Sequence, residues 1–262
     1  MKQFTVSVVQ FDASLGPADE KTLSRMERAI DRADADLVVF PELATTGYHV
    51  FDQLADVAEP VPGPTTERLG EAARAADVEV LFGMPVFEDG AVYNSAVWLA
   101  ADGSVRARYD KRHCWGGERE VFTPGDEYLA VDAPFGRVGV QICYDLTFPE
   151  ASAALARAEC DLVVNISAWT AQMERDWQRL LPARAVENGA YVVGCNRTGT
   201  EAGNTFCGKS TVIEPDGARI VELGDAAGQA RVTLHPGVVA AERDRNPLRE
   251  DRPTDDASLR ID

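Results

Sequence analysis

The sequence predicts an α/β fold in one domain, and two observations lead to this prediction. Apolar runs of strand length recur along the whole 262-residue chain. Between several of these runs lie stretches in which apolar residues return at helical spacing. The hydrophobic fraction of 45% is enough for a substantial core, and no internal repeat or low-complexity linker divides the chain. We therefore expect a single domain over residues 1–239.

The predicted elements follow one another in an order that mixes βα units with hairpins. Three Asp-Gly turns, in "EDGAVYN", "AADGS" and "EPDGA", join neighbouring strands. After Val239 the charged tail is nearly free of apolar residues, so residues 240–262 are expected to form an arm over the surface or over a partner subunit. Strands are predicted at 4–11, 36–42, 79–87, 92–100, 104–111, 136–145, 161–169, 190–197, 210–217 and 230–236, and helices at 20–33, 65–75, 149–158 and 171–188.

The charge of the chain excludes some partners. The formal net charge is −17, from 43 acidic and 26 basic residues. Nucleic acid and anionic membranes both require a basic surface, so neither is an expected partner. Acidity of this kind with few lysines fits solvation in a high-salt cytoplasm, although a GC-rich genome would also favour Arg over Lys. The lysines are Lys2, Lys21, Lys111 and Lys209.

Two further features point to a soluble cytoplasmic protein. No apolar run approaches the roughly 20 residues that a membrane span needs, and the N-terminal "MKQFTVSVVQFDAS" alternates like a strand instead of forming a signal-peptide core. The cysteines are odd in number and widely spaced, without a Cys-x-x-Cys pair, so we expect free thiols and neither a disulfide framework nor a zinc site. They are Cys114, Cys143, Cys160, Cys195 and Cys207.

Three predicted strands end in a reactive side chain. "DLVVFPE" ends at Glu42, "RARYDK" ends at Lys111, and "GVQIC" ends at Cys143. Each residue alone is a weak signal, because an unpaired cysteine is usually a buried small hydrophobe and a lone lysine is usually on the surface. However, α/β sheets collect their active sites at the carboxyl ends of strands. A nucleophile, a base and a cation that stabilises an oxyanion are the groups that acyl transfer requires.

The segments that carry these residues resemble the signature blocks of the carbon–nitrogen hydrolase (nitrilase) superfamily. The matching blocks are "FPELATTGY", "VYNSAVW", "YDKRHCW", "GEREVFTPGD", "GVQICYDLTFPE", "ARAVENGAYVVGCNRTG" and "GKSTVIEPDG". They occur in the family's order and cover nearly the whole chain, which makes the resemblance specific. It implies a four-layer αββα sandwich, no metal or organic cofactor, and assembly into a homodimer or a higher homo-oligomer.

The resemblance also implies a Glu-Lys-Cys triad, which falls on Glu42, Lys111 and Cys143. A second family glutamate lies six residues before the Pro of the Pro-Gly pair, which selects Glu118 over Glu120. From the residues themselves, a thiol near a helix start and an ammonium would have its thiolate favoured, and Glu42 could accept its proton. The Lys111 ammonium and the backbone N–H of Tyr144 would then stabilise the developing oxyanion.

Several neighbouring residues have two interpretations. Asp145 could orient the cysteine loop or serve only as a cap or turn residue. Arg197 could bind an anionic substrate group or a structural carboxylate. His113 would allow a Cys-His protease, but that reading leaves Glu42 and Lys111 unexplained. Aromatic side chains near the motifs could line the pocket or belong to the core: Tyr48, Trp115, Phe148 and Trp169.

The predicted function is that of an amidase on the amidase-like branch of the family. It would cleave the C–N bond of a small linear amide or N-carbamoyl compound through a cysteine thioester and release ammonia or an amine. The cysteine block reads Cys-Tyr-Asp where nitrilases commonly have Cys-Trp-Glu, and the chain is compact. A nitrilase that converts a nitrile to an acid and ammonia is the alternative. A non-catalytic binding protein is disfavoured by the intact triad, and a Cys/His metal protein by the lack of ligand spacing.

Overall fold

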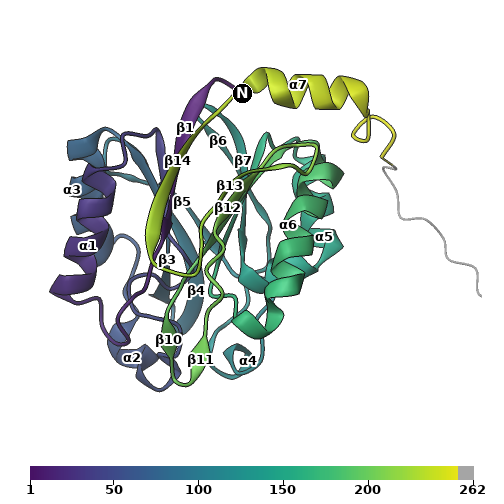
Figure 1. Cartoon of the computed structure of the whole chain (residues 1–262). Helices are drawn as coiled ribbons and strands as arrows, with labels where there is room; N and C mark the ends of the chain where they lie inside the picture. The colour runs from purple at the N-terminus through teal and green to yellow at the C-terminus, as the bar shows by residue number, and fades with distance from the viewer. Residues whose placement is uncertain (253–262) are drawn as a thin grey trace, which may run out of the picture.

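The computed structural model describes residues 1–252, which form two mixed β-sheets packed face to face between two layers of helices. In Figure 1 the sheets stand side by side in the centre, with α1 (Glu20–Asp31) and α3 (Pro64–Ala76) outside one and α5 (Pro149–Arg157) and α6 (Glu174–Asn188) outside the other. The four-layer αββα sandwich that the sequence predicted is therefore confirmed. The shorter helices are α2 (Leu54–Val57), α4 (Glu118–Val121) and α7 (Pro236–Arg245).

The first sheet has the strand order β14-β1-β2-β3-β4-β5. Its central strands run parallel, because α1 connects β1 to β2 and α3 lies between β2 and β3. The Asp-Gly turns of the sequence then add β4 and β5 as antiparallel hairpins, while β14 returns from the C-terminal region to pair with β1. The strands are β1 (Phe4–Gln10), β2 (Leu37–Val39), β3 (Glu79–Glu88), β4 (Ala91–Leu99), β5 (Val105–Asp110) and β14 (Gly228–Leu234).

The second sheet has the order β13-β12-β9-β8-β7-β6 and is built in the same way. Its parallel centre is formed by β7, β8 and β9, with α5 and α6 as the crossovers, and antiparallel strands extend both edges. A separate two-stranded hairpin, β10 (Thr200–Glu201) and β11 (Asn204–Thr205), follows β9. The strands of the sheet are β6 (Leu129–Ala133), β7 (Gly136–Ile142), β8 (Leu162–Ser167), β9 (Tyr191–Asn196), β12 (Thr211–Ile213) and β13 (Arg219–Glu222).

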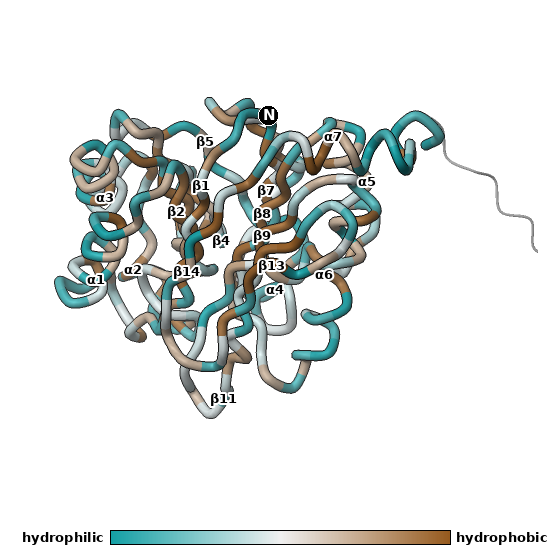
Figure 2. The backbone as a smooth tube through the Cα atoms, turned by 45° about the horizontal axis from the view of Figure 1, so that its top comes forward, coloured by the Kyte–Doolittle hydropathy of each residue, from teal (hydrophilic) through white to brown (hydrophobic). Residues whose placement is uncertain are grey.

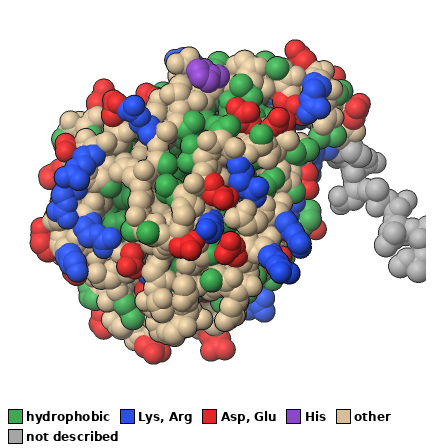
Figure 3. Space-filling view, viewed as in Figure 1, with side chains coloured by type: hydrophobic (Ala, Val, Ile, Leu, Met, Phe, Trp, Pro, Cys, Tyr) green, Lys and Arg blue, Asp and Glu red, His purple; other side chains and the backbone are tan. Residues whose placement is uncertain are grey.

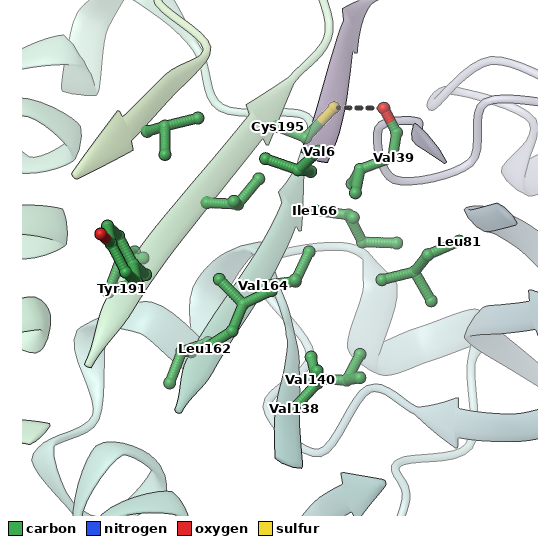
Figure 4. Close-up of a cluster of buried hydrophobic side chains, with 14 of the residues drawn as sticks. Val6, Val39, Leu81, Val138, Val140, Leu162, Val164, Ile166, Tyr191 and Cys195 are labelled. Atoms are coloured by element: carbon green, nitrogen blue, oxygen red, sulfur yellow. Dashed lines mark hydrogen bonds between the residues drawn. The ribbon is translucent and has the colours of Figure 1, made fainter. Parts of the chain in front are cut away.

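The main core lies between the two sheets. Successive side chains of a strand point to opposite faces, so Leu37 and Val39 of β2 enter the core between the sheets while Val38 packs against α1 and α3. Strands buried on both faces read as continuous apolar runs, which Figure 2 shows as brown strands in the interior. Figure 4 shows this core, in which Cys195 of β9 reaches across and donates a hydrogen bond to the Val39 carbonyl at 3.3 Å.

The helix layer over the second sheet lies close to it at glycines. A Cβ added to Gly194 of β9 would lie 2.5 Å from Leu181 and 2.9 Å from Trp177, both of α6. Only a residue without a side chain allows α6 to approach the sheet at this point. This approach matters for the site, because α6 also contacts the turn that carries Cys143.

The predicted elements agree closely with the observed ones, with four exceptions among the strands. The prediction lacked β6, β10, β11 and β13: β10 and β11 have two residues each, and β6 and β13 have no buried residue. Helix α7 begins before residue 240 and continues into the predicted arm, where Arg243 donates to the Gly189 carbonyl at 3.0 Å. Residues 253–262 of that arm lie outside the described residues. Within residues 1–252, no helix is long and apolar enough to cross a membrane.

Candidate active site

The three reactive strand ends of the sequence meet at one end of the sandwich, beyond β2, β5 and β7. The Lys111 ammonium lies 2.7 Å from Glu42 Oε1 and 2.8 Å from both carboxylate oxygens of Glu118, and all three side chains have no exposed surface. Cys143, the first residue after β7, is buried beside them. The structure thus places two carboxylates, one ammonium and one thiol together, and the first sheet supplies Glu42 and Lys111 while the second supplies Cys143.

Glu42 is held by hydrogen bonds to both of its carboxylate oxygens. Oε1 accepts from Asn94 Nδ2 at 2.7 Å in addition to Lys111, and Oε2 accepts from the backbone N–H of Ala168 at 2.8 Å. The Glu42 loop lies directly over β3, where a Cβ on Gly83 would be 2.4 Å from the Leu43 nitrogen. Gly83 is therefore required for this loop to approach the strand.

Glu118 is the carboxylate that faces Lys111, and Glu120 is exposed. The Tyr48 hydroxyl donates to Glu118 Oε1 at 2.5 Å, and the Trp115 backbone N–H donates to Oε2 at 2.9 Å. Glu118 and Glu120 lie two positions apart in the short helix α4, a rotation of about 200° around the helix axis, so they face opposite sides, Glu118 inward and Glu120 outward. Of the two glutamates that the motif spacing compared, the structure thus places Glu118 beside Lys111 and Glu120 on the surface.

Cys143 adopts a backbone conformation that is rare for a residue with a side chain. Its φ is 48°, in the left-handed region, at the start of a 3₁₀ turn over Cys143–Thr147. The expectation that a helix dipole favours the thiolate is wrong, because α5 begins only at Pro149 and a 3₁₀ turn lies between. The strained backbone is of the kind that concentrates at functional sites.

Burial dominates the electrostatics of the site. It raises the pKa of the Cys143 thiol well above its usual value, Glu42 raises it further, and Lys111 only partly opposes this. The expectation of a favoured thiolate therefore does not hold for the resting site. Burial also raises the pKa of Glu42, against the opposing effect of Lys111. Although burial lowers the pKa of Lys111, the two carboxylates raise it well above its usual value, so Lys111 is an ammonium.

Asp145 holds the cysteine turn in place. Its carboxylate accepts from the Ile142 N–H at 3.0 Å, the Tyr109 hydroxyl at 2.8 Å and both the backbone N–H and the ring of His113. Asp145 therefore has both of the roles considered for it. It caps the 3₁₀ turn by accepting from the Ile142 N–H, and the same hydrogen bond orients the cysteine turn, because Ile142 is the residue before Cys143. His113 is engaged with Asp145 and stacks on Phe148 at 3.7 Å between ring centroids.

Two supporting residues were not predicted from the sequence. Arg184 of α6 is buried and donates from Nε and Nη2 to the Leu146 carbonyl, at 3.0 Å each, which ties the cysteine turn to the helix layer. Asn94 of β4 holds Glu42. Both lie in motif blocks, "ARAVEN" and "VYNS", but nothing local in a sequence tells which carbonyl or carboxylate a distant polar side chain will reach.

Arg197 has a structural partner, not an anionic substrate group. It lies 2.9 Å from Glu201 Oε2 and stacks over the Phe206 ring. The other oxygen of Glu201 accepts from the backbone N–H groups of Tyr48 at 2.9 Å and His49 at 2.6 Å. The hairpin β10-β11 therefore holds the loop from which Tyr48 reaches Glu118, at the lower end of the molecule in Figure 1.

A small pocket lies over Cys143, with a volume of about 20 Å³. Three of the four aromatic candidates line it, and Phe148 does not. A larger cavity of about 550 Å³, between α7 and the opposite ends of the strands, contains none of the triad residues. We assign the chemistry to the small pocket because Cys143 belongs to its lining and not to that of the larger cavity. Its lining is Tyr48, Trp115, Cys143, Tyr144, Ala168, Trp169, Thr170 and Met173.

The other cysteines lie apart from this pocket lining. None of the five cysteines, all of which fall in the described part of the chain, forms a disulfide. Burial raises the pKa of Cys160 to about 12 and that of the half-buried Cys114 to about 11. Within residues 1–252, no three His, Cys, Asp or Glu side chains form a group that could hold a metal ion.

The fold and a buried Glu-Lys-Cys cluster define a carbon–nitrogen hydrolase. The sequence profile of the carbon-nitrogen hydrolase family matches residues 5–252. An (R)-stereoselective amidase of a Pseudomonas species is 36% identical over 234 residues, which are 88% of this chain and 85% of that protein. The chain therefore belongs to the carbon-nitrogen hydrolase family, and the predicted family and enzyme class are confirmed.

Two solved structures are similar over nearly the whole chain. A CN-hydrolase superfamily protein of Xanthomonas campestris with an arsenic adduct in its active site has a TM-score of 0.89 and 26% identity, and the match covers 98% of this chain and 100% of that one. An amidase of Nesterenkonia sp. AN1, with glutamine in place of a glutamate, has a TM-score of 0.81 and 28% identity. The match covers 94% of this chain and 96% of that one. That structure shows covalent addition of the acetamide moiety of fluoroacetamide at the active-site cysteine.

Proposed function

We propose that this protein is an amidase that hydrolyses a small linear amide or N-carbamoyl compound through a thioester on Cys143. The observation that carries the proposal is the fully buried Lys111 between Glu42 and Glu118, beside a thiol that opens into a pocket. This arrangement supplies a nucleophile, a proton acceptor and a fixed positive charge without any bound cofactor.

In the first half-reaction Glu42 accepts the proton of the Cys143 thiol while the sulfur attacks the carbonyl carbon. A C–S bond forms, and the carbonyl π electrons move to the oxygen. The Lys111 ammonium and the Tyr144 N–H stabilise this oxyanion. The oxyanion then returns its electrons to carbon, the C–N bond breaks, and the nitrogen leaves with the proton from Glu42. Thioester and ammonia or amine are the products of this half-reaction.

In the second half-reaction water takes the place of the amine. Glu42 removes a proton from the water as its oxygen attacks the thioester carbon, and the C–S bond breaks when the tetrahedral species collapses. The sulfur recovers its proton from Glu42, and the acid is released. Burial raises the pKa of Glu42, which makes its carboxylate a stronger proton acceptor, and it raises the pKa of Cys143, so the sulfur keeps its proton until Glu42 takes it.

Glu118 acts on the reaction through Lys111. It balances the buried ammonium and fixes its position, since it contacts Lys111 with both oxygens and is itself held by Tyr48 and the Trp115 N–H. We assign it a positioning role next to the catalytic Glu42, Lys111 and Cys143.

The test is a comparison of kcat/KM for an amide and for the nitrile of the same acyl group, measured by ammonia release. The amide is expected to be the better substrate. Cys143→Ala should abolish turnover in both assays, and mass spectrometry of the wild type with a slow substrate should find an acyl adduct on the Cys143 peptide. A tenfold preference for the nitrile, about 1.4 kcal/mol in transition-state binding, would make the enzyme a nitrilase instead.

We further propose that the enzyme works in a high-salt cytoplasm as a homodimer or higher homo-oligomer. The acidic composition supports the first part. The second is supported by two exposed apolar side chains, Val186 of α6 and Ile220 of β13, the helix over the second sheet and the edge strand of that sheet. Light scattering after size exclusion in concentrated KCl measures the assembly, and a monomer at micromolar concentration would contradict it.

A further inference from the structure

We infer that the enzyme selects substrates whose acyl group carries no charge, and that it rejects amides with a carboxylate near the scissile bond. This inference deepens the proposed function, on which it rests. It would narrow the substrate class to neutral carboxamides and neutral N-carbamoyl amines, and it would exclude N-carbamoyl amino acids.

The first argument is the composition of the pocket. Besides Cys143, its lining consists of four aromatic residues and three small or flexible ones: Tyr48, Trp115, Tyr144, Trp169, Ala168, Thr170 and Met173. None of these carries a charge, and within residues 1–252 no Arg, Lys or His belongs to the lining. Two of the polar groups are already engaged, because the Tyr48 hydroxyl donates to Glu118 and Trp169 Nε1 donates to the Met173 carbonyl at 2.7 Å.

The second argument is the charge beneath the pocket. Two carboxylates and one ammonium leave the cluster of Glu42, Glu118 and Lys111 with one net negative charge when all three are ionised. A carboxylate on the acyl group would approach this charge in surroundings of low dielectric, where like charges repel strongly. The Lys111 ammonium is shared between two carboxylates and is assigned to the carbonyl oxygen of the substrate, so it is not free to pair with a second anion on the acyl group.

The third argument is the size of the pocket. A volume of about 20 Å³ is room for roughly one water molecule. A carboxylate bound there would lose part of its hydration shell without gaining a cation from the lining, and burial of an unpaired charge is costly. A methyl or methylene group, in contrast, fits the aromatic walls. Trp115, 39% exposed, and the flexible Met173 are the walls that can move to admit an acyl chain.

The experiment measures kcat/KM for matched amides. Malonamate and 3-methylbutanamide have the same heavy-atom skeleton, with two carboxylate oxygens in one and two methyl groups in the other. We expect kcat/KM for malonamate to be lower by about 100-fold or more. 3-Aminopropanamide and butyramide test the opposite charge, and the neutral butyramide should again be preferred, but by a smaller factor, because the uncharged lining disfavours an ammonium while the negative cluster attracts it. Equal or faster turnover of either charged amide would overturn the inference.

The second part of the experiment introduces a positive charge into the lining of the pocket. In Met173→Arg the ratio of kcat/KM for malonamate to that for 3-methylbutanamide should rise by about tenfold or more, because the new guanidinium can pair with the carboxylate. Met173→Leu is the control and should leave the ratio unchanged. Thr170→Arg repeats the test from a second wall position. If both arginine variants fold and neither changes the ratio, the lack of a wall cation is not the cause of the selectivity.

Failure of the proposed function can be told apart from failure of this inference. If the enzyme prefers nitriles, the matched pair becomes cyanoacetate and 3-methylbutanenitrile, and the neutral member should still be turned over faster. The reacting group, amide or nitrile, and the charge of the acyl group are thereby tested separately. A nitrilase with no preference for neutral substrates would contradict both proposals, whereas an amidase that accepts malonamate would contradict only this one.

Discussion

At the scale of single residues, Lys111 determines the character of the site. A lysine without exposed surface is rare unless it is paired, and here two carboxylates pair it. Loss of one partner from a buried ion pair typically costs about 3–5 kcal/mol, because the remaining charge is left uncompensated. Substitutions in this cluster should therefore affect both turnover and stability, and isosteric changes are the informative ones.

Glu118→Gln should reduce kcat by about 10²-fold or more while the protein stays folded, because the amide keeps the shape but gives Lys111 only one carboxylate partner. Glu120→Gln is the matched control and should be near wild type, since Glu120 is exposed. Steady-state kinetics and thermal unfolding measure both variants. The opposite ranking would show that the carboxylate at Glu118 has no part in turnover.

Lys111→Met should reduce kcat by several orders of magnitude, since it removes the charge that stabilises the oxyanion, a contribution of roughly 3–4 kcal/mol for a single donor. It should also leave Glu42 and Glu118 facing each other, so that one of them takes up a proton. Kinetics with the short amide measure the first effect. A change in KM alone would mean that Lys111 binds only the ground state.

The pH dependence of kcat/KM should show the raised pKa of Glu42. A raised pKa keeps the carboxyl protonated to higher pH, and the reaction needs the carboxylate, so activity should rise with pH through a midpoint above about 4.3, the ordinary value for glutamate. On the alkaline side the raised pKa of Cys143 should keep the thiol form beyond about pH 8.5, the ordinary value for cysteine. A fall in activity near pH 8.5 would contradict the assignment of a buried thiol.

At the scale of elements, the site depends on how closely its loops approach the strands. Gly83→Ala should abolish activity, because the new Cβ would be forced against the Leu43 nitrogen at 2.4 Å and displace Glu42. The overpacking should also cost about 1–3 kcal/mol of stability. Gly224→Ala, with no atom near the added Cβ, is the control. Normal kinetics in Gly83→Ala would mean that the Glu42 loop tolerates a shift.

The sequence predicted the elements that carry the site because their signals are local. The sequences of buried strands such as Leu162–Ser167 are apolar runs, and the proline at the first helical position indicated that α5 begins at Pro149. The edge strands β6 and β13 of the second sheet gave no such signal and have no buried residue, whereas the edge strands β5 and β14 of the first sheet were predicted. In the same way the reactive residues at strand ends could be found, whereas the contacts of Asn94, Asp145 and Arg184 could not, because their partners come from other elements of the fold.

At the scale of the whole molecule, charge is the prominent feature. Figure 3 shows acidic and basic side chains spread over the face that it presents, and the chain as a whole carries a net charge of −17. Repulsion between like charges over such a surface is long-ranged in dilute buffer, whereas the screening length falls to about 3 Å at 1 M salt. Stability should therefore depend on ionic strength far more than on any single ion pair.

The temperature of unfolding should rise steadily as KCl increases from about 0.1 M to 3 M, because screening relieves the repulsion that opposes the compact state. Circular dichroism at several KCl concentrations measures the effect. The same series in sucrose, which also favours compact states but does not screen charge, is the control. An unfolding temperature independent of KCl would contradict adaptation to high salt.

The two sheets share one active centre, and they follow one another along the chain. Glu42, Lys111 and Glu118 all precede the connection between α4 and β6, and Cys143 and its supports follow it. A cut in that connection would yield two fragments, each with one β-sheet and the helix layer that covers it. Strand β14 of the second fragment could still pair with β1 of the first. Neither fragment could perform the reaction. Ammonia release from a mixture of the two would report their reassembly, which makes this chain suitable as a split enzyme.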